Sequence, residues 1–489
     1  METYQHILFV LAAALAATAL LAHAAAGSDL FVGAATVSIT PSQPVALSGQ
    51  YHTRVAKTVE TPITATAVAI EGRSAGQTGE AAIMVSCDLV GIGDTIQPRL
   101  RERLRGKLAG FDLNKLWLSA THTHTAPVGR SFWEDGYVIP KEGVMQPGEF
   151  IEFLLDRLGE VVVKAWEGRQ PGGVSWALGH AVVGHNRRAV YDNGRARMYG
   201  ATNTPEFRAL EGGEDHGVEM LFFWDQNKAP LAIAINLACT SQEVEGRSAV
   251  NADFWHDVRE QLRAKYGQGL CVLAWCSAAG DQSPHLLYRQ RAEERMLKLR
   301  GLTRMQEIGR RISRAVEEVY ELARNDIRAS APFVHQVQVV KLPRRKVTDE
   351  ELARAQARHE ELSKKAKLGP DEPVRMAEAK SIMDRYEQQK EQPDYEMELH
   401  VIRLGDAAIA TNPFELYLDY GLQIKARSKA TQTFVVQLSC ATGFYLPTEK
   451  GVRGGHYSTE VGSVFVSPDG GQVLVNRTVE AINALWPGQ

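Results

Sequence analysis

The sequence lacks several features that mark common classes of protein. With 55 Lys and Arg against 58 Asp and Glu, the net charge is only −3, so we expect no nucleic-acid partner. None of the five cysteines falls in a C-x-x-C pair, which argues against a cysteine-rich zinc site. After the first segment, no apolar run is long enough to span a bilayer.

The first segment is a short apolar run without charge. It extends from Ile7 to Leu21 and ends at Ala22-His23-Ala24, which resembles a signal-peptidase site. No Lys or Arg precedes it, and the alternative is an uncleaved anchor. We expect residues 1–24 to be a signal peptide and the protein to be secreted or periplasmic. Export would permit disulfides, although an odd number of cysteines leaves at least one thiol unpaired.

From Asp29 to about Ile327, short apolar runs alternate with helical patterns. This alternation predicts an α/β domain with a mixed β-sheet core flanked by helices. The expected strands are 81–85, 116–120, 231–235 and 271–275, and the clearest expected helices are 150–166 and 254–266.

Residues 344–396 have a different composition, rich in Glu, Lys, Arg, Ala and Gln and broken at Gly369-Pro370. The pattern predicts a helical hairpin insertion, either a solvated arm or, less in keeping with its charge, a binding arm. Strand patterns resume at 399–402 and 433–436. We therefore expect a single catalytic domain, residues 29–489, interrupted by this insertion.

Two polar clusters directly follow predicted strands, where α/β folds place their sites. His122 and His124 are two residues apart after the strand 116–120, so both rings can point the same way and bind zinc. The alternative is a pair of surface histidines. Gly280-Asp281-Gln282-Ser283 follows the strand 271–275 and lacks the elbow motif of serine hydrolases, so by itself it also fits a plain turn.

Two further clusters lie nearer the C-terminus. Glu415 precedes a helical pattern that continues to Lys425, where a carboxylate ordinarily complements the helix dipole. Tyr445 and Tyr457 lie in Gly- and Pro-containing loops, where tyrosines ordinarily serve packing.

Taken in order, the segments resemble the neutral/alkaline (non-lysosomal) ceramidase family from end to end of the mature chain. The most specific match is Thr121-His122-Thr123-His124. The other matching segments are 31–41, 86–89, 186–188 and 280–284, Glu415 with Gly421 six residues later, and the pair Tyr445 and Tyr457. Phe414 stands where the family has glycine before the glutamate.

The resemblance implies a zinc-dependent hydrolase that cleaves the amide bond of an N-acyl sphingoid base. His122, Glu415 and Tyr445 would be zinc ligands. The pocket would be lined by three residues that stabilise the oxyanion, His124, Arg187 and Tyr457. Ser283 corresponds to the family's essential serine, whose role as nucleophile or in positioning stays open. The implied partner is a lipid or small-molecule substrate, with peripheral contact to a membrane.

The sequence departs from the family at one zinc ligand. The family has a further zinc-binding histidine after a central strand, where this chain has Cys239 or Thr240. Asp253 and His256, one helical turn apart, follow downstream. We expect His256 to restore the nitrogen ligand, with Asp253 orienting its ring or sharing the ion. The alternative is that His256 lies on a helix surface and the site has three ligands or is inactive.

After the tyrosine loop, the sequence leaves no room for the C-terminal β-sandwich domain that full-length neutral ceramidases carry. This second departure leaves two alternatives to ceramide hydrolysis. The same scaffold would act on another amide, an ester or a carbohydrate derivative, or the chain would be a metal-free binding protein.

Export is directly testable. N-terminal sequencing of protein secreted from a suitable host should begin near Ala25, because the apolar run would be removed after the Ala22-His23-Ala24 site. Intact Met1 in the soluble cytoplasmic fraction would contradict this expectation.

Overall fold

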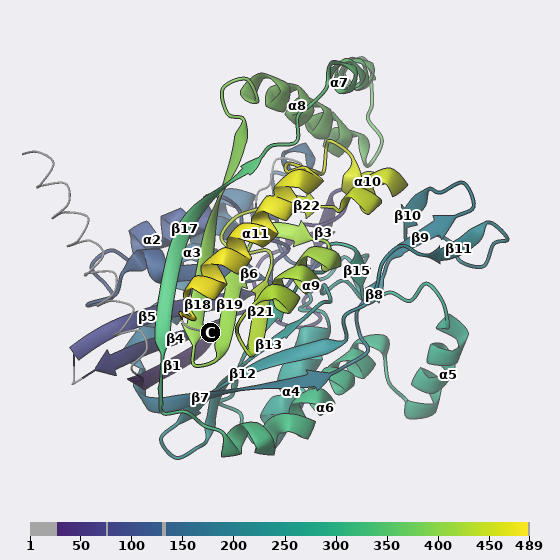
Figure 1. Cartoon of the computed structure of the whole chain (residues 1–489). Helices are drawn as coiled ribbons and strands as arrows, with labels where there is room; N and C mark the ends of the chain where they lie inside the picture. The colour runs from purple at the N-terminus through teal and green to yellow at the C-terminus, as the bar shows by residue number, and fades with distance from the viewer. Residues whose placement is uncertain (1–26, 75–76, 130–133, 488–489) are drawn as a thin grey trace, which may run out of the picture.

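Two β-sheets of different size form the core of the protein (Figure 1). The computed structural model describes residues 27–74, 77–129 and 134–487, so the expected signal peptide, residues 1–24, lies outside the described residues. The larger sheet has the order β14 (Cys271–Cys276), β13 (Pro230–Leu237), β12 (Gly217–Asp225), β7 (Gln170–His180), β1 (Ser28–Ser38), β4 (Thr64–Ser74), β5 (Gln77–Cys87) and β6 (Leu116–Ala120), and β16 (Ser330–Ala331) pairs with β1. The pairs β13–β14 and β5–β6 are parallel and the other pairs are antiparallel, which confirms the mixed sheet.

The smaller sheet has the order β17 (Phe333–Pro343), β18 (Asp394–Leu404), β19 (Ala407–Thr411) and β21 (Gln432–Val436). It faces the larger sheet, and helices cover the outer faces of both. The helices against the larger sheet are α2 (Ile96–Arg103), α3 (Pro147–Glu167), α4 (Phe254–Tyr266) and α6 (Arg304–Asn325). Those against the smaller sheet are α9 (Leu418–Arg427) and α11 (Pro468–Ala484).

Alternation along each strand explains this layering, because successive side chains point to opposite faces of a sheet. In β6, Leu116 and Leu118 pack in the core shared with α3, whereas Trp117 packs in the core between the sheets. Both faces are buried, so the strand is apolar except at Ser119, in agreement with the pattern from which it was predicted.

The larger sheet curls so that β14, at one edge, approaches β5 and β6 at the other. The Ser86 hydroxyl donates a hydrogen bond of 2.7 Å to the carbonyl of Ala274. The rings of Trp117 and Trp275 lie 5.7 Å apart. The curl brings the loops after β6, β13 and β14 together, and these loops carry the predicted polar clusters.

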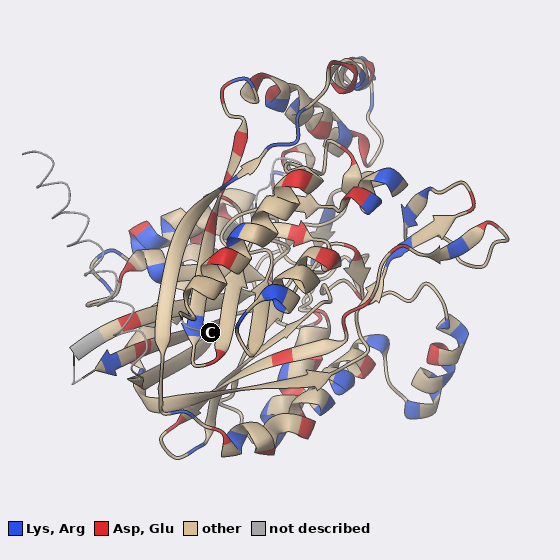
Figure 2. Cartoon of the chain, in the orientation of Figure 1, with Lys and Arg blue, Asp and Glu red and all other residues tan. Residues whose placement is uncertain are grey.

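The charged insertion forms the helical hairpin predicted from sequence, α7 (Asp349–Ser363) and α8 (Glu372–Gln388) (Figure 2). Its outer faces are solvated. The inner face of α8 is not, because Val374 packs with Ala46, Val128 and Tyr137. The predicted hairpin is therefore solvated on its outer faces and anchored through the inner face of α8.

The region around Glu415 also differs from expectation. Glu415 lies in a short strand, β20 (Phe414–Leu416), which pairs in parallel with β22 (Phe444–Leu446), and α9 begins only at Leu418. The Asp281 carboxylate accepts a hydrogen bond from the Leu418 amide and so satisfies the first turn of α9. Glu415 is consequently free of the capping role that its sequence position suggests.

The remaining elements are short and surround the site. They are β2 (Val45–Leu47), β3 (Arg54–Ala56), β8 (His185–Asn186), β9 (Arg188–Tyr191), β10 (Ala196–Met198), β11 (Phe207–Leu210), β15 (Gln282–Ser283), α5 (Gln290–Arg300) and α10 (Glu449–Gly454). All five cysteines are buried and free. No described helix combines the length and apolar composition that a membrane crossing requires. The described residues contain no separate C-terminal β-sandwich.

One buried ion pair joins α4 to the loop after β5. Arg259 donates two hydrogen bonds, of 2.7 and 2.9 Å, to Asp88, which also accepts from the backbone amide of Thr64. Arg259→Met should lower the free energy of unfolding by about 3–5 kcal/mol, because it leaves a buried carboxylate uncompensated. Urea denaturation measures this loss.

The double variant Asp88→Asn/Arg259→Met should recover part of the loss, because no buried charge then remains. Arg324→Met removes only an exposed pair with Glu321 and should cost less than about 1 kcal/mol. Equal losses in Arg259→Met and Arg324→Met would contradict the assignment.

Candidate active site

A cavity of about 320 Å³ lies where the loops after β6, β13 and β14 meet β20 and β22. Its size and its mostly aromatic and apolar lining, with a few convergent polar groups, are typical of a small-molecule site. Six of the predicted site residues line it: His122, His124, Arg187, Glu415, Tyr445 and Tyr457.

The turn after β6 fixes the His122 ring. His122 has a left-handed backbone, with φ of 67°, and the adjacent Thr123 amide donates to the carbonyl of Leu89. The His122 Nδ1 donates a 2.7 Å hydrogen bond to the carbonyl of Val90, so its Nε2 is the nitrogen left for a ligand. That Nε2 lies 3.4 Å from Glu415 Oε2.

Glu415 presents a buried carboxylate to His122. Its Oε2 is buried and has no hydrogen-bond partner among the described residues. Burial raises the pKa of Glu415, but His122 and Arg187 outweigh burial and hold the pKa below its ordinary value, so the group is ionised. Tyr445, the partner of Glu415 in the β20–β22 ladder, stays protonated because burial and the Glu415 charge raise the pKa of its phenol.

The separation of the His122 and Glu415 donor atoms fits a zinc ion. Two donors each about 2.1 Å from a tetrahedral ion lie about 3.4 Å apart, and zinc commonly takes histidine nitrogen and carboxylate oxygen. The Nε2–Oε2 distance of 3.4 Å matches this separation, and the unpartnered Oε2 is the atom that an ion would satisfy. The predicted three-residue ligand set is thus brought together in one cavity.

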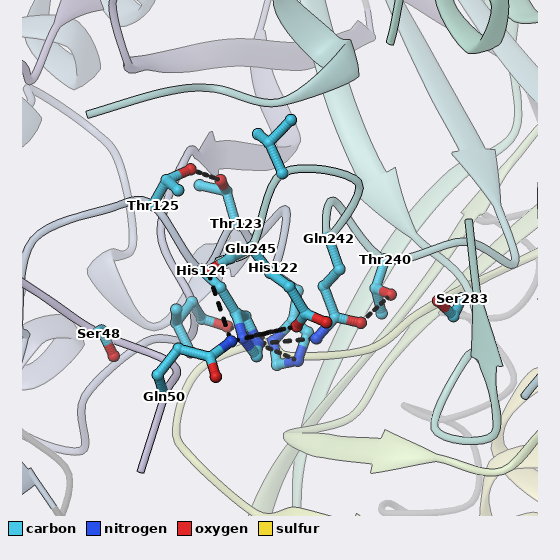
Figure 3. A network of polar contacts seen from close by, with 12 residues as sticks. Ser48, Gln50, His122, Thr123, His124, Thr125, Thr240, Gln242, Glu245 and Ser283 are labelled. Atoms are coloured by element: carbon cyan, nitrogen blue, oxygen red, sulfur yellow. Dashed lines mark hydrogen bonds and ion pairs between the residues drawn. The ribbon is translucent and has the colours of Figure 1, made fainter. Parts of the chain in front are cut away.

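His124 lies beside His122 and is held by two residues from the loop after β13 (Figure 3). The two Nε2 atoms are 3.3 Å apart. The Gln242 amide donates to His124 Nε2 at 2.8 Å, and His124 Nδ1 lies 3.3 Å from Glu245 Oε2. Burial lowers the pKa of His124 despite the Glu245 carboxylate, so the ring is neutral near pH 7.

Arg187 is buried and contacts four segments of the site. Its Nη1 donates to the Tyr199 hydroxyl at 2.7 Å and to Gln242 Oε1 at 3.2 Å. Its Nη2 donates to the carbonyl of Gly280 at 2.8 Å and to the Tyr445 hydroxyl at 3.4 Å. Burial opposes its charge, but the surrounding tyrosines and Glu415 raise its pKa, so a fixed positive charge faces the cavity.

Ser283 is fully buried in β15, does not line the cavity, and lies to one side of the histidines. Its hydroxyl accepts a hydrogen bond from the His285 amide. The residues before Ser283 lie close to Glu415. A Cβ added to Gly280 would lie 2.3 Å from the Glu415 carbonyl oxygen. The motif therefore packs the loop closely against Glu415, and Ser283 interacts with Tyr199, a residue that lines the cavity.

The structure does not bring Asp253 and His256 to the cavity. Asp253 caps α4, where its carboxylate accepts from the amides of Phe254 and Val244, and His256 lies on that helix outside the cavity lining. Cys239 is buried in the core beneath α4, and the Thr240 hydroxyl donates to Gln242 Oε1. The expected nitrogen replacement at His256 is thus not supported by its position.

Sequence reasoning missed Gln242, Glu245 and Tyr199. Gln242 and Glu245 lie within eight residues of the end of β13. Their position after a buried strand was the sequence feature that could have identified them as site residues. Tyr199 is placed by the hairpin of β9 and β10 and carries no local signal.

A second group of ligand-type side chains lies away from the cavity. Among the described residues, Glu398, His400 and Cys440 are the one His, Cys, Asp or Glu set with ligand atoms all within 4.8 Å. Glu398 already accepts two hydrogen bonds from Arg101 and one from Gln97. The positive charge of Arg101 balances the Glu398 carboxylate and disfavours a bound cation. We therefore interpret Glu398, His400 and Cys440 as a structural cluster.

Structural comparison identifies the fold. A neutral ceramidase from Pseudomonas aeruginosa superposes with a TM-score of 0.69 at 18% identity, and a ceramidase complexed with C2 with a TM-score of 0.66 at 15% identity. Each alignment covers 94% of this chain and 75% of the ceramidase chain. The chain has the neutral ceramidase fold. This confirms the fold resemblance seen in the motifs, whereas no protein-family model and no curated protein sequence matches the chain.

The Glu245 carboxylate makes a specific contribution to acid stability. Burial raises its pKa, but His124, His285 and Arg187 lower it to about 2. A depressed pKa stabilises the fold above the unfolded value of about 4.5, and this contribution is lost as the pH falls toward 2. The stability gap between wild type and Glu245→Gln should therefore shrink by about 3 kcal/mol between pH 5 and pH 2.

Urea denaturation at a series of pH values measures this gap. Glu321→Gln, an exposed control, should show a gap that does not change with pH. A gap for Glu245→Gln that is constant with pH would contradict the assignment.

Proposed function

We propose that this protein is an exported, zinc-dependent amidase that cleaves an N-acyl sphingoid base or a related N-acyl amine. The observation that carries the proposal is the convergence of His122 Nε2, the unpartnered Glu415 Oε2 and Tyr445 in one cavity. Three protein donors with an open position are the arrangement of catalytic zinc sites. Peripheral contact with a membrane would follow if the substrate is a lipid.

A bound zinc ion would polarise the substrate carbonyl and lower the pKa of water to about 7. The side chains supply the remaining functions. His124 is neutral, and its ring lines the cavity beside the ligand position, 3.3 Å from His122 Nε2. Gln242 and Glu245 fix the orientation of its ring.

Arg187 and Tyr457 face the position where negative charge would develop on the substrate oxygen. Arg187 is a permanent cation, and burial raises the pKa of Tyr457 so that its hydroxyl remains a donor. Preorganised donors of this kind stabilise an oxyanion because they need no reorganisation during the reaction. Ser283 would act through the loop it belongs to, as a positioning residue.

Metal content tests the proposal. Purified wild-type protein should contain one zinc ion per chain by elemental analysis, and His122→Ala and Glu415→Gln should each weaken zinc affinity at least 10–100-fold, because each removes a ligand. His256→Ala should retain the metal, because His256 lies outside the cavity lining.

Amide hydrolysis provides a second test of the proposal. A short-chain N-acyl sphingoid base or a simple N-alkyl amide should be hydrolysed, and the activity should disappear on chelation and return with zinc. Wild-type protein without metal and without hydrolysis would favour a binding protein. Equal metal in wild type and His122→Ala would exclude the proposed ligand set.

A further inference from the structure

Helix α8 of the charged insertion forms part of the cavity wall. Glu378, near the middle of this helix, lines the same cavity as His122 and Glu415. Val374, one turn earlier, anchors this face of α8 by packing with Ala46 and Tyr137. The insertion therefore contributes a carboxylate to the proposed substrate site.

The segment 48–51 links the two ends of the cavity. Gly49 packs against His124, where a Cβ would lie 2.4 Å from the ring carbon Cγ. Two residues later, Tyr51 also lines the cavity and interacts electrostatically with Glu378. Two residues span at most about 7 Å. Glu378 and the reactive groups thus line the same cavity of about 320 Å³.

The Glu378 carboxylate makes no direct pair with a cation among the described residues. It forms no hydrogen bond or ion pair with any residue in the described ranges. The nearby Arg375 pairs with Asp371 at 2.7 Å and lies over the Tyr51 ring at 5.5 Å. Burial and the neighbouring Glu460 raise the pKa of Glu378, and the opposing charge of Arg375 does not offset them.

The backbone makes room for this carboxylate. A Cβ added to Gly462, another cavity residue, would lie 2.1 Å from Glu378 Oε1. The carboxylate therefore lies directly against the backbone of the 462–463 segment, on the wall of the cavity.

We propose that Glu378 binds a positively charged amino group of the substrate, on the amine side of the scissile amide. The preferred substrate would then be an N-acyl derivative of a diamine or of another basic amine. This inference rests on the proposed amidase function and specifies its substrate class. A half-buried carboxylate forms its strongest hydrogen bond with an ammonium group and a weaker one with a hydroxyl. It forms none with a methyl group.

Three amides of equal length test the proposal: N-(3-aminopropyl)hexanamide, N-(3-hydroxypropyl)hexanamide and N-butylhexanamide. They differ only in a terminal ammonium, hydroxyl or methyl group. For wild type, kcat/KM should be at least about tenfold higher for the ammonium amide than for the hydroxyl amide. Glu378→Gln should bring this ratio close to one, because it keeps the shape of the side chain and removes its charge.

Matched variants separate this role from a general effect on α8. Glu387→Gln changes an exposed glutamate of the same helix and should keep the wild-type ratio. Gly462→Ala should lower the ratio, because the new methyl group displaces the Glu378 carboxylate. A wild-type ratio at or below one, or an unchanged ratio in Glu378→Gln, would overturn the proposal.

Binding measurements distinguish this inference from the amidase proposal. If wild type hydrolyses none of the three amides, the amidase proposal fails for these compounds, and calorimetry with the same amides still tests Glu378. Tighter binding of the ammonium amide that is lost in Glu378→Gln supports the site. Equal binding of the ammonium and butyl amides overturns it.

Discussion

The buried Arg187 guanidinium is the constraint on which the candidate site depends. A charge withdrawn from water is tolerated only when acceptors surround it. Arg187 meets this condition through Tyr199, Gln242, Gly280 and Tyr445, which come from four separate segments. Each of these segments must therefore be in place for the charge to be satisfied, and their convergence forms the cavity.

A second arginine plays a similar role on the histidine side. Arg54 donates hydrogen bonds to the carbonyls of Ser48 and His124 through one nitrogen and to those of Glu245 and Arg247 through the other. These carbonyls belong to the three loops that position His124. Because the acceptors are backbone atoms, Arg54 fixes the positions of these loops. The side chains of His124 and Glu245 remain able to contact each other.

Much of the fold was predictable because its strands are buried on both faces. The run 116–120 is apolar except at Ser119, and it forms β6 with the bounds expected. The site was predictable where a residue pattern reports a strand end, as at His122 and His124. The role of Asp253 was not predictable, because a carboxylate one turn before a histidine is also typical of a helix N-cap. In the structure Asp253 caps α4 and accepts a hydrogen bond from the Phe254 amide.

The remaining misses have a tertiary origin. Glu415 reads as the start of a helix, yet it pairs in a ladder with Tyr445, thirty residues later, and no local pattern predicts this pairing. Gln242 has an ordinary sequence context, and only the fold places its amide between His124 and Arg187.

The loop after β13, where the family resemblance implies a histidine, contributes Gln242 to the site. Gln242, from the loop where that histidine is missing, uses its oxygen for Arg187 and its nitrogen for His124, so its amide is occupied with orienting other groups. The donors that remain are one nitrogen, one carboxylate and one phenol. Glu415 Oε2 is buried without a protein hydrogen bond, but His122 Nε2 at 3.4 Å and Arg187 Nη2 at 3.9 Å hold the pKa of this carboxyl below its ordinary value. A cation at this position would satisfy the acceptor capacity that Oε2 retains, and this is the basis of the proposed metal site.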